Sequence, residues 1–322
     1  MGITAALAAL VWFVLAPEAA VSAAFVPLLL GMVFVGLPHG ALDHLVPIRM
    51  GAAWGRRPVA MAVFLGGYVG LAFAYLLLWA VEPRIAFVGF LVATVVHWGQ
   101  GDIDFLERFL GRHRAAVGGH LAAIALRGAL PVAIPVLAQP EVAEGLLMAA
   151  VDALGGTIGG GMALSAPIVR WVLATLLLGC GLAYVAGLRR AWSTQVGRWF
   201  DVGEVALLVV LFTWVPAYLA IGVYFLAWHA LRHLARLLLL RERDVRAIAG
   251  GDLRGPVFRL ARDLTPITLL ALAFLAALGA WSGTRIDNVG DFVALYLVWI
   301  SALTMPHLAV VAWMDHAADG RR

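Results

Sequence analysis

Long apolar stretches recur along nearly the whole chain, and this feature constrains the fold more than any other. Hydrophobic residues make up 63% of the 322 residues, and charged residues only 13%. A soluble domain is about 45–50% apolar and about 25% charged. Because this chain cannot cover a water-facing surface with polar groups, we expect an all-α, polytopic helix bundle in the lipid bilayer. We expect residues 1–322 to form a single integral-membrane domain, which excludes a soluble enzyme, a secreted module and a nucleic-acid-binding protein.

About ten apolar stretches are candidates for transmembrane helices, since a helix needs ~20 residues to cross the ~30 Å hydrocarbon core. The first and the seventh are shorter than a full span. Between the fifth and the sixth, the segment 139–163 is rich in glycine, and we expect a flexible external loop there. The predicted stretches are 3–16, 21–48, 59–81, 85–105, 115–138, 164–187, 201–214, 216–240, 264–281 and 292–314.

The basic residues indicate the topology. All 23 are arginine, and they gather after the even-numbered stretches, whereas the other loops are poor in arginine. Arginine-rich loops tend to stay in the cytoplasm. We therefore predict a multi-pass protein of the cell (inner) membrane with both termini in the cytoplasm, in which every even-numbered helix runs from outside to inside. The arginines after the even-numbered stretches are Arg49, Arg56, Arg57, Arg108, Arg112, Arg114, Arg189, Arg190, Arg198, the six from Arg241 to Arg262, Arg321 and Arg322.

Two residue types are scarce, and their scarcity limits the chemistry. The chain has no lysine, so it cannot form the lysine Schiff base by which a rhodopsin holds retinal. Its single cysteine, Cys180, lies in an apolar stretch, which excludes a disulfide framework and a thiolate metal site.

Five of the nine histidines lie well inside predicted transmembrane helices, whereas the other four are near helix ends or in loops: His44, His113, His120 and His316. Each of the five lies late in an even-numbered helix, so the topology places all five at a similar depth in the cytoplasmic half of the bilayer. Ionisable side chains are costly within a membrane and by default indicate function. We therefore expect a histidine-lined metal site at this depth, although hydrogen-bonded histidines in helix contacts remain an alternative. The five are His39, His97, His229, His233 and His307.

His229 and His233 are four residues apart, which on a helix places both imidazoles on one face. This spacing allows both rings to bind one metal ion. Imidazole suits zinc, copper, iron and nickel. Four histidine ligands with one or two open positions suit non-haem iron(II) that reacts with O₂, whereas a zinc hydrolase is the alternative.

Acidic residues accompany several of these histidines. Asp43 follows His39 by one helical turn and is a candidate for the outer hydrogen bond that a metal-bound histidine usually makes. We interpret Asp102, Asp104 and Asp315 as polar helix ends at the membrane interface.

Four further charged residues receive structural interpretations. Asp201 and Glu204 have capping-box spacing, so we predict a helix cap rather than an acid–base pair. We expect Arg232 to extend to the inner membrane interface. Arg127 lies in the middle of the fifth stretch and needs a partner or a water-filled cavity, and the sequence does not identify the partner.

Aromatic residues surround the histidine motifs. One interpretation is ordinary packing and an interfacial aromatic belt. The functional interpretation is an apolar tunnel for a long, flat, lipid-soluble substrate. The candidate tunnel residues are Trp98, Tyr224, Phe225, Trp228 and Trp299.

Four motifs in order carry a resemblance to a known family. They are PHGALDH at 38–44, HWGQGD at 97–102, WHALRH at 228–233 and PHLAVVAWMD at 306–315. Together they resemble the Brp/Blh family, the bacteriorhodopsin-related proteins assigned as β-carotene 15,15′-dioxygenases. The resemblance extends from about residue 31 to residue 315.

The resemblance implies an iron-dependent membrane oxygenase that splits β-carotene, or a related carotenoid, with O₂ into two all-trans-retinal molecules. By motif, it implies that His39, His97, His229 and His233 are the catalytic Fe(II) ligands. His307 is then a fifth ligand, an outer hydrogen-bond donor or a cap on the substrate cavity. A retinal-binding rhodopsin is the implied downstream partner. Carotene, retinal and iron follow from the resemblance and not from residue spacing.

Three other classes are alternatives. A bis-histidine haem protein for electron transfer would show a Soret band. A di-iron lipid desaturase would need about eight histidines in several motifs, and this chain has five that are well placed. A carotenoid-binding or transport protein would bind pigment without consuming O₂.

Overall fold

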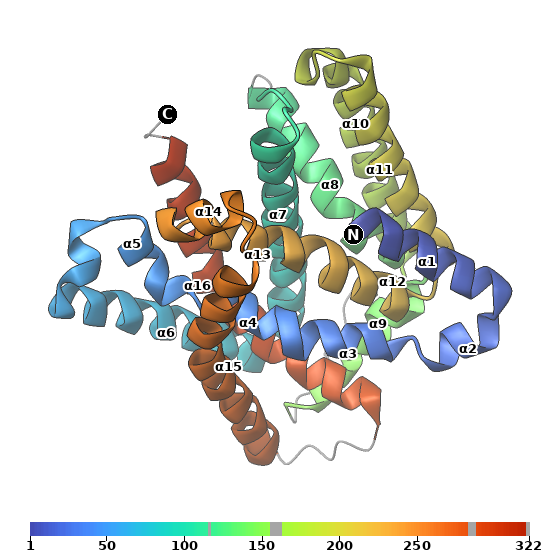
Figure 1. Ribbon diagram of the computed structural model, residues 1–322. Helices are drawn as coiled ribbons and strands as arrows, with labels where there is room; N and C mark the ends of the chain where they lie inside the picture. Colours follow the sequence, from blue (N-terminus) through green and yellow to red (C-terminus); the bar gives the residue numbers. More distant parts are fainter. Residues whose placement is uncertain (115–116, 155–162, 283–287, 320–322) are drawn as a thin grey trace. The chain divides into compact units, whose positions relative to one another are not determined.

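The chain is entirely helical in the described part of the computed structural model, which contains no strand (Figure 1). It folds into two compact units, each assembled from three segments. Unit 1 contains Met1–Met32, Thr94–Leu147 and Gly159–Arg232, and unit 2 contains the remaining segments. The expectation of a single integral-membrane domain stays a prediction. The described residues are all those outside 115–116, 155–162, 283–287 and 320–322, and the side chains of His39, Ser282 and residues 318–319 are also not described.

Unit 1 is built around α8, which packs against α10 and α11, while α12 packs against α3. Its core is apolar and includes Leu208, Leu211 and Phe212. Its helices are α1 (Gly2–Leu15), α2 (Pro17–Ser22), α3 (Phe25–Gly31), α8 (Val117–Ala138), α10 (Pro167–Ala191), α11 (Gln195–Trp214), α12 (Ala217–Tyr224) and the π-helix η4 (Phe225–His229).

Unit 2 is built around α6 and α16, which lie side by side (Figure 1). The indole nitrogen of Trp79 on α6 donates a hydrogen bond of 2.7 Å to the Ser301 hydroxyl on α16. Its helices are the π-helix η1 (Met32–Gly36), of which Val33 onward belongs to the unit, α4 (Leu37–Gly40), η2 (Asp43–Leu45), α5 (Val46–Arg49), η3 (Ala53–Arg56), α6 (Pro58–Val81), α14 (Glu242–Ala249), α15 (Arg254–Ser282) and α16 (Val289–Asp319).

Besides η1, three helices cross the boundary between the units in sequence: α7 (Pro83–Phe109), α9 (Pro140–Asp152) and α13 (Ala230–Leu238). Within unit 1, α7 and α8 make backbone contact. A Cβ atom on Gly99 would lie 2.0 Å from the carbonyl oxygen of Ile124, and one on Gly128 would lie 1.8 Å from that of Val95. Because any side chain here would force the backbones apart, glycine permits this crossing, as small residues do between membrane helices.

Six segments of the described residues are long and apolar enough to cross a membrane, so the expected ten helices are not confirmed. Two of the expected transmembrane helices are not apolar enough along a full span, because they carry polar and charged residues. The second half of α7 is polar from His97 onward, and α11 carries Arg198, Asp201 and Glu204. The six segments are Pro17–Gly36, Pro58–Val81, Val117–Ala138, Pro167–Ala191, Arg254–Trp281 and Val289–Ala317.

Two predicted segments differ from the structure. The stretch 21–48 is divided into short pieces, because Pro38 and Pro47 lack the backbone N–H that a continuous helix needs. The segment 139–163, expected to be a loop, contains α9, which begins with Pro140 and buries Leu147 and Ala150. Proline suits the first position of a helix because its missing N–H is not needed there. The glycine-rich part at 155–161 lies outside the described residues.

Candidate functional site

Unit 1 brings two of the predicted histidines together. The rings of His97 on α7 and His229 on η4 are both buried, and their centroids lie 5.0 Å apart at 72°. Two aromatic residues fix the His229 ring. Trp98 lies 5.4 Å from it, and Phe225 stacks on it at 6.1 Å and 9°. This is a rigid, apolar setting for two imidazoles.

Unit 2 brings together His233, His307 and Asp43. The Nδ1 atom of His307 lies 2.8 Å from one Asp43 carboxylate oxygen and 3.0 Å from the other. The His233 and His307 rings lie 5.3 Å apart. The hydroxyl of Tyr68 donates to Asp43 at 2.9 Å. An ionised carboxylate accepts hydrogen bonds, so it places the His307 proton on Nδ1 and the lone pair on Nε2.

His39 lies on α4, and its side chain is outside the described residues. The neighbouring backbone is nevertheless located within unit 2. A Cβ atom on Gly40 would lie 3.6 Å from His307 Nδ1 and 3.9 Å from an oxygen of Asp43. The helical turn that carries His39 therefore lies beside the Asp43–His307 pair.

Within the described residues, no group of three or more histidine, cysteine or acidic side chains is arranged to hold a metal ion. That set does not include His39. The donor chemistry present fits iron, because imidazoles are ordinary ligands for it and these imidazoles are buried. The two histidine pairs belong to different units, and their joint binding of one ion stays a prediction.

The structure supplies the partners of Arg127 that the sequence did not identify. Its guanidinium is fully buried in unit 1 and donates to three carboxylates, those of Asp102, Asp201 and Glu204. Tyr184 also bonds to Asp201. We call this set, together with Arg232, Trp192 and Trp228, the Arg127 network.

The network corrects the predicted capping box. Asp201 and Glu204 do not cap α11, because the helix begins at Gln195 and Thr194 caps it by accepting from the Gly197 N–H at 3.1 Å. Both acids are instead buried in the interior. Capping boxes and buried carboxylate pairs share the same three-residue spacing, so the sequence pattern did not separate them.

Two interfacial assignments are also wrong. Asp102 is buried and accepts hydrogen bonds from Arg127, Arg232 and the indole of Trp228. Arg232 does not extend freely to an interface. It binds Asp102 and Glu204, and its guanidinium carbon lies 4.5 Å from the Phe105 ring centroid.

The other two predicted interfacial acids form simpler pairs. Asp104 binds Arg108, one turn along α7, and Asp315 binds Arg236 within unit 2. Both acids are partly exposed, in agreement with helix-end positions.

The candidate tunnel residues fall in both units. In unit 1, Trp98 contacts Tyr224 at 5.2 Å, and Tyr224 stacks on Trp228 at 6.2 Å. In unit 2, Trp299 stacks on Phe274 and donates to the Ala271 carbonyl at 3.1 Å. These contacts are packing contacts, and the tunnel stays a prediction.

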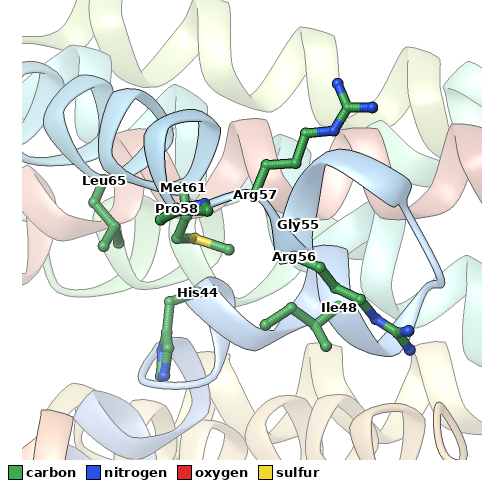
Figure 2. Close-up of a pocket in the computed structure, with 8 residues that line it drawn as sticks. All are labelled: His44, Ile48, Gly55, Arg56, Arg57, Pro58, Met61 and Leu65. Carbon is green, nitrogen blue, oxygen red and sulfur yellow. The ribbon is translucent and has the colours of Figure 1, made fainter.

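A separate hollow of about 330 Å³ opens at the surface of unit 2, and Figure 2 shows Ile48 and Met61 beside it. Next to it, His44 donates from Nδ1 to the Ala41 carbonyl at 2.9 Å, and burial lowers the pKa of its imidazole. Among the predicted metal ligands whose side chains are described, none lines this hollow. The lining residues are His44, Ile48, Gly55, Arg56, Arg57, Pro58, Met61 and Leu65.

Sequence reasoning missed Tyr68, Tyr184 and Trp192. Each lies alone in an apolar or loop segment, where a polar aromatic side chain usually belongs to the interfacial belt. In the structure each donates to a buried carboxylate: Tyr68 to Asp43, and the other two to Asp201.

Fold and site together define a class: a helical protein with membrane-length apolar segments and paired buried histidines. A family model described as beta-carotene 15,15'-dioxygenase matches residues 30–315. The chain therefore belongs to the β-carotene 15,15′-dioxygenase family, and the predicted resemblance is confirmed.

Several curated relatives match over most of both chains. The "Probable beta-carotene 15,15'-dioxygenase Blh" of Halobacterium salinarum is 35% identical over 302 residues, covering 91% of this chain and 85% of the relative. The "Probable beta-carotene 15,15'-dioxygenase Brp" of the same organism is 30% identical over 323 residues, covering 89% and 82%. The "Beta-carotene 15,15'-dioxygenase" of an uncultured marine bacterium is 24% identical over 295 residues, covering 90% and 94%. No solved structure matches.

Proposed function

We propose that this chain is a membrane-embedded, iron-dependent oxygenase that cleaves β-carotene at its central 15,15′ double bond. The family supports carotenoid cleavage, and the names of the matched relatives supply the substrate and the bond. The observation that carries the iron proposal is the pairing of buried imidazoles in a chain otherwise poor in polar groups: His97 with His229, and His233 with His307.

The proposed iron ligands are His39, His97, His229 and His233, with His307 held by Asp43 either as a further ligand or as an outer donor. Bound iron(II) would supply the redox chemistry that lets O₂ react with an alkene. Asp43 fixes the tautomer of His307 and thereby the atom that carries its lone pair. Trp98 and Phe225 orient the His229 ring and keep water away from it.

The reaction balances without another reductant. One C15=C15′ bond of β-carotene breaks, two C=O bonds form, and both oxygen atoms come from one O₂ molecule, giving two molecules of retinal. The carbons are oxidised and O₂ is reduced. Because the chain contains no lysine, it cannot trap the aldehyde product as a lysine imine. This absence favours release of retinal, for which a rhodopsin is the proposed recipient.

The substrate and the apolar segments suggest the location. β-Carotene dissolves in the lipid core, and six described segments are long and apolar enough to cross it. We propose that the protein lies in the cell membrane with both termini in the cytoplasm, and that the substrate enters from the bilayer beside the proposed aromatic tunnel.

Bacterial cells that accumulate β-carotene provide the test. We would express the wild type and His229→Ala, extract the pigments and separate them by liquid chromatography. We expect the wild type to bleach the cells and form retinal, and His229→Ala to form at least ~100-fold less, because a proposed iron ligand is removed. His316→Ala is the matched control, since His316 is exposed on α16.

Each other outcome has a definite meaning. An aldehyde of another chain length would support the oxygenase activity but would show that a bond other than 15,15′ is cleaved. Orange cells without aldehyde, despite good expression of the wild type, would contradict the enzyme and favour a carotenoid carrier. A Soret band in the purified protein would contradict the non-haem site.

A further inference from the structure

We propose that Asp102 is a positioning residue: it anchors Trp228 and Arg232 and thereby holds His229 in place against His97. All the contacts involved lie within unit 1. The metal-binding readout below rests on the proposed function, whereas the positioning of the two rings is testable without any metal.

Two neighbouring rows of α7 side chains face the helical segment that carries His229. The first row is His97 and Gly101. The His97 ring lies 5.0 Å from that of His229, and a Cβ atom on Gly101 would lie 3.9 Å from His229 Cε1. The second row is Trp98 and Asp102, again one turn apart. The His229 ring therefore lies against α7, beside His97 and Gly101.

The second row contacts the residues on either side of His229. Trp98 lies 6.0 Å from Phe225, which precedes His229 by four residues. Asp102 Oδ1 accepts from the Trp228 indole at 3.1 Å and from the Arg232 guanidinium. One aromatic contact and two hydrogen bonds to the same carboxylate oxygen thus bracket His229 along its segment.

This bracketing matters because η4 is π-helical. A π-helix has a wider turn than an α-helix, which changes the direction of every side chain beyond it. Such segments are often found at functional sites. Fixing Trp228 and Arg232 to one carboxylate fixes the register of η4, and with it the direction of the His229 ring.

Asp102 is itself held firmly. Its second oxygen accepts from Arg127, which is fully buried and also binds Asp201 and Glu204. Arg232 closes the set by donating to Glu204 at 2.6 Å. A closed set of buried, paired charges has one favourable arrangement, because every alternative leaves a charge without a partner in low dielectric.

The experiment uses the full-length protein in lipid nanodiscs, with metal removed by a chelator. Cobalt(II) is titrated, and its visible absorption reports imidazole ligation. We expect Asp102→Asn to raise the Kd for cobalt(II) by up to about tenfold, the lower end of the range for a direct outer-shell contact, because Asp102 acts on His229 through Trp228 and Arg232. Arg232→Gln, at the more exposed edge of the network, is the second variant should Asp102→Asn fail to fold.

Tyr184→Phe is the control for a merely structural role. It removes the hydroxyl that bonds to Asp201 at the far end of the same network. We expect it to lower the Tm without changing the Kd for cobalt(II). If Tyr184→Phe and Asp102→Asn change the Kd in proportion to their loss of Tm, Asp102 only stabilises the fold and the proposal is overturned.

A readout without metal separates this proposal from the proposed iron site. Diethyl pyrocarbonate modifies accessible imidazoles, and peptide mass spectrometry locates the product. We expect Asp102→Asn to increase modification of His97 and His229 several-fold, and Tyr184→Phe to leave it unchanged. If the wild type binds no cobalt(II), the iron site fails. In that case, the positioning role of Asp102 is supported if modification of His97 and His229 rises in Asp102→Asn, and it is contradicted if modification does not rise.

Discussion

Single residues in unit 2 show how a buried histidine is oriented. Asp43 receives hydrogen bonds from His307 and from the Tyr68 hydroxyl, so one carboxylate holds two aromatic side chains from α16 and α6. A metal-binding histidine usually donates its other ring N–H to a carboxylate, a backbone carbonyl or a water molecule. The orientation of His307 therefore depends on Asp43, and the role proposed for His307 depends on that orientation.

We expect Asp43→Asn to reduce retinal formation in carotene-accumulating cells by about tenfold or more, because an amide supports the His307 tautomer less strongly than a carboxylate. Retinal is measured per amount of protein in the membrane. Asp152→Asn, which changes an exposed acid on α9, is the control and should have no effect. Wild-type yields from Asp43→Asn would show that His307 needs no carboxylate.

His44 gives a pH-dependent expectation at the same scale. It lies outside the six apolar segments, and burial lowers the pKa of its imidazole below the ordinary value of about 6.5. The unfolded chain therefore takes up this proton at a higher pH than the folded protein does. As the pH falls through about 6.5 toward the lowered value, His44 makes the folded state less stable.

We therefore expect lowering the pH from about 7.5 to about 5.5 to reduce the Tm of the wild type more than that of His44→Gln, because glutamine does not titrate in this range. Thermal unfolding in detergent at both pH values measures the difference. His316→Gln, at an exposed position, is the control for histidine titration elsewhere. A difference between His44→Gln and wild type that does not change with pH would contradict the expectation.

At the scale of elements, helix pairing is set by where small residues occur. Gly99 on α7 and Gly128 on α8 let two backbones touch, and this crossing places Asp102 next to Arg127. Similarly, a Cβ atom on Gly222 of α12 would lie 2.4 Å from the backbone nitrogen of Leu28 on α3. The charge pairs of unit 1 thus depend on glycine contacts.

We expect Gly99→Ala to destabilise the protein by about 1–3 kcal/mol or more, because the new methyl group would overlap the Ile124 carbonyl oxygen. Thermal unfolding of the purified protein measures the loss. Gly179→Ala on α10 is the matched control, since a Cβ atom there meets open space. Equal Tm values for the two variants would show that α7 and α8 are not in backbone contact.

The sequence identifies candidate site residues better than it identifies which side chains contact one another. The helical class, the family and the proximity of His97 to His229 followed from composition, motifs and depth. The partners of Arg127 did not, because they lie 25, 74 and 77 residues away and no local spacing encodes such distances. The segment 21–48 was predicted as one helix because hydropathy does not register the effect of proline on backbone hydrogen bonding.

The same pairing bears on two of the four expected spans that the structure does not confirm, α7 and α11. Asp102, Asp201 and Glu204 make α7 and α11 polar by composition, yet in unit 1 their charges are matched by Arg127 and Arg232. Charges paired in this way are the kind that membrane interiors tolerate. The hydropathy of a single helix does not take into account the opposite charges that neighbouring helices supply.

At the scale of the whole molecule, the position of Arg56 decides between two topologies. Six spans and ten spans are both even numbers, so both place the two termini on the same side. With the N-terminus inside, ten spans place Arg56 in the cytoplasm, because both the stretch 3–16 and the stretch 21–48 precede it. Six spans place it outside, because Pro17–Gly36 alone precedes it. Its side chain is exposed and extends from the rim of the surface hollow (Figure 2).

Because arginine-rich loops stay in the cytoplasm, we expect Arg56→Cys to be cytoplasmic. In a Cys180→Ala background, a membrane-impermeant maleimide should label Arg56→Cys only after the cells are permeabilised. Two exposed positions serve as controls, since both topologies agree on them. Glu141→Cys should react in intact cells, and Arg246→Cys should react only after permeabilisation. Labelling of Arg56→Cys in intact cells would show that α1 does not cross the membrane, and that the arginines before α6 break the charge rule.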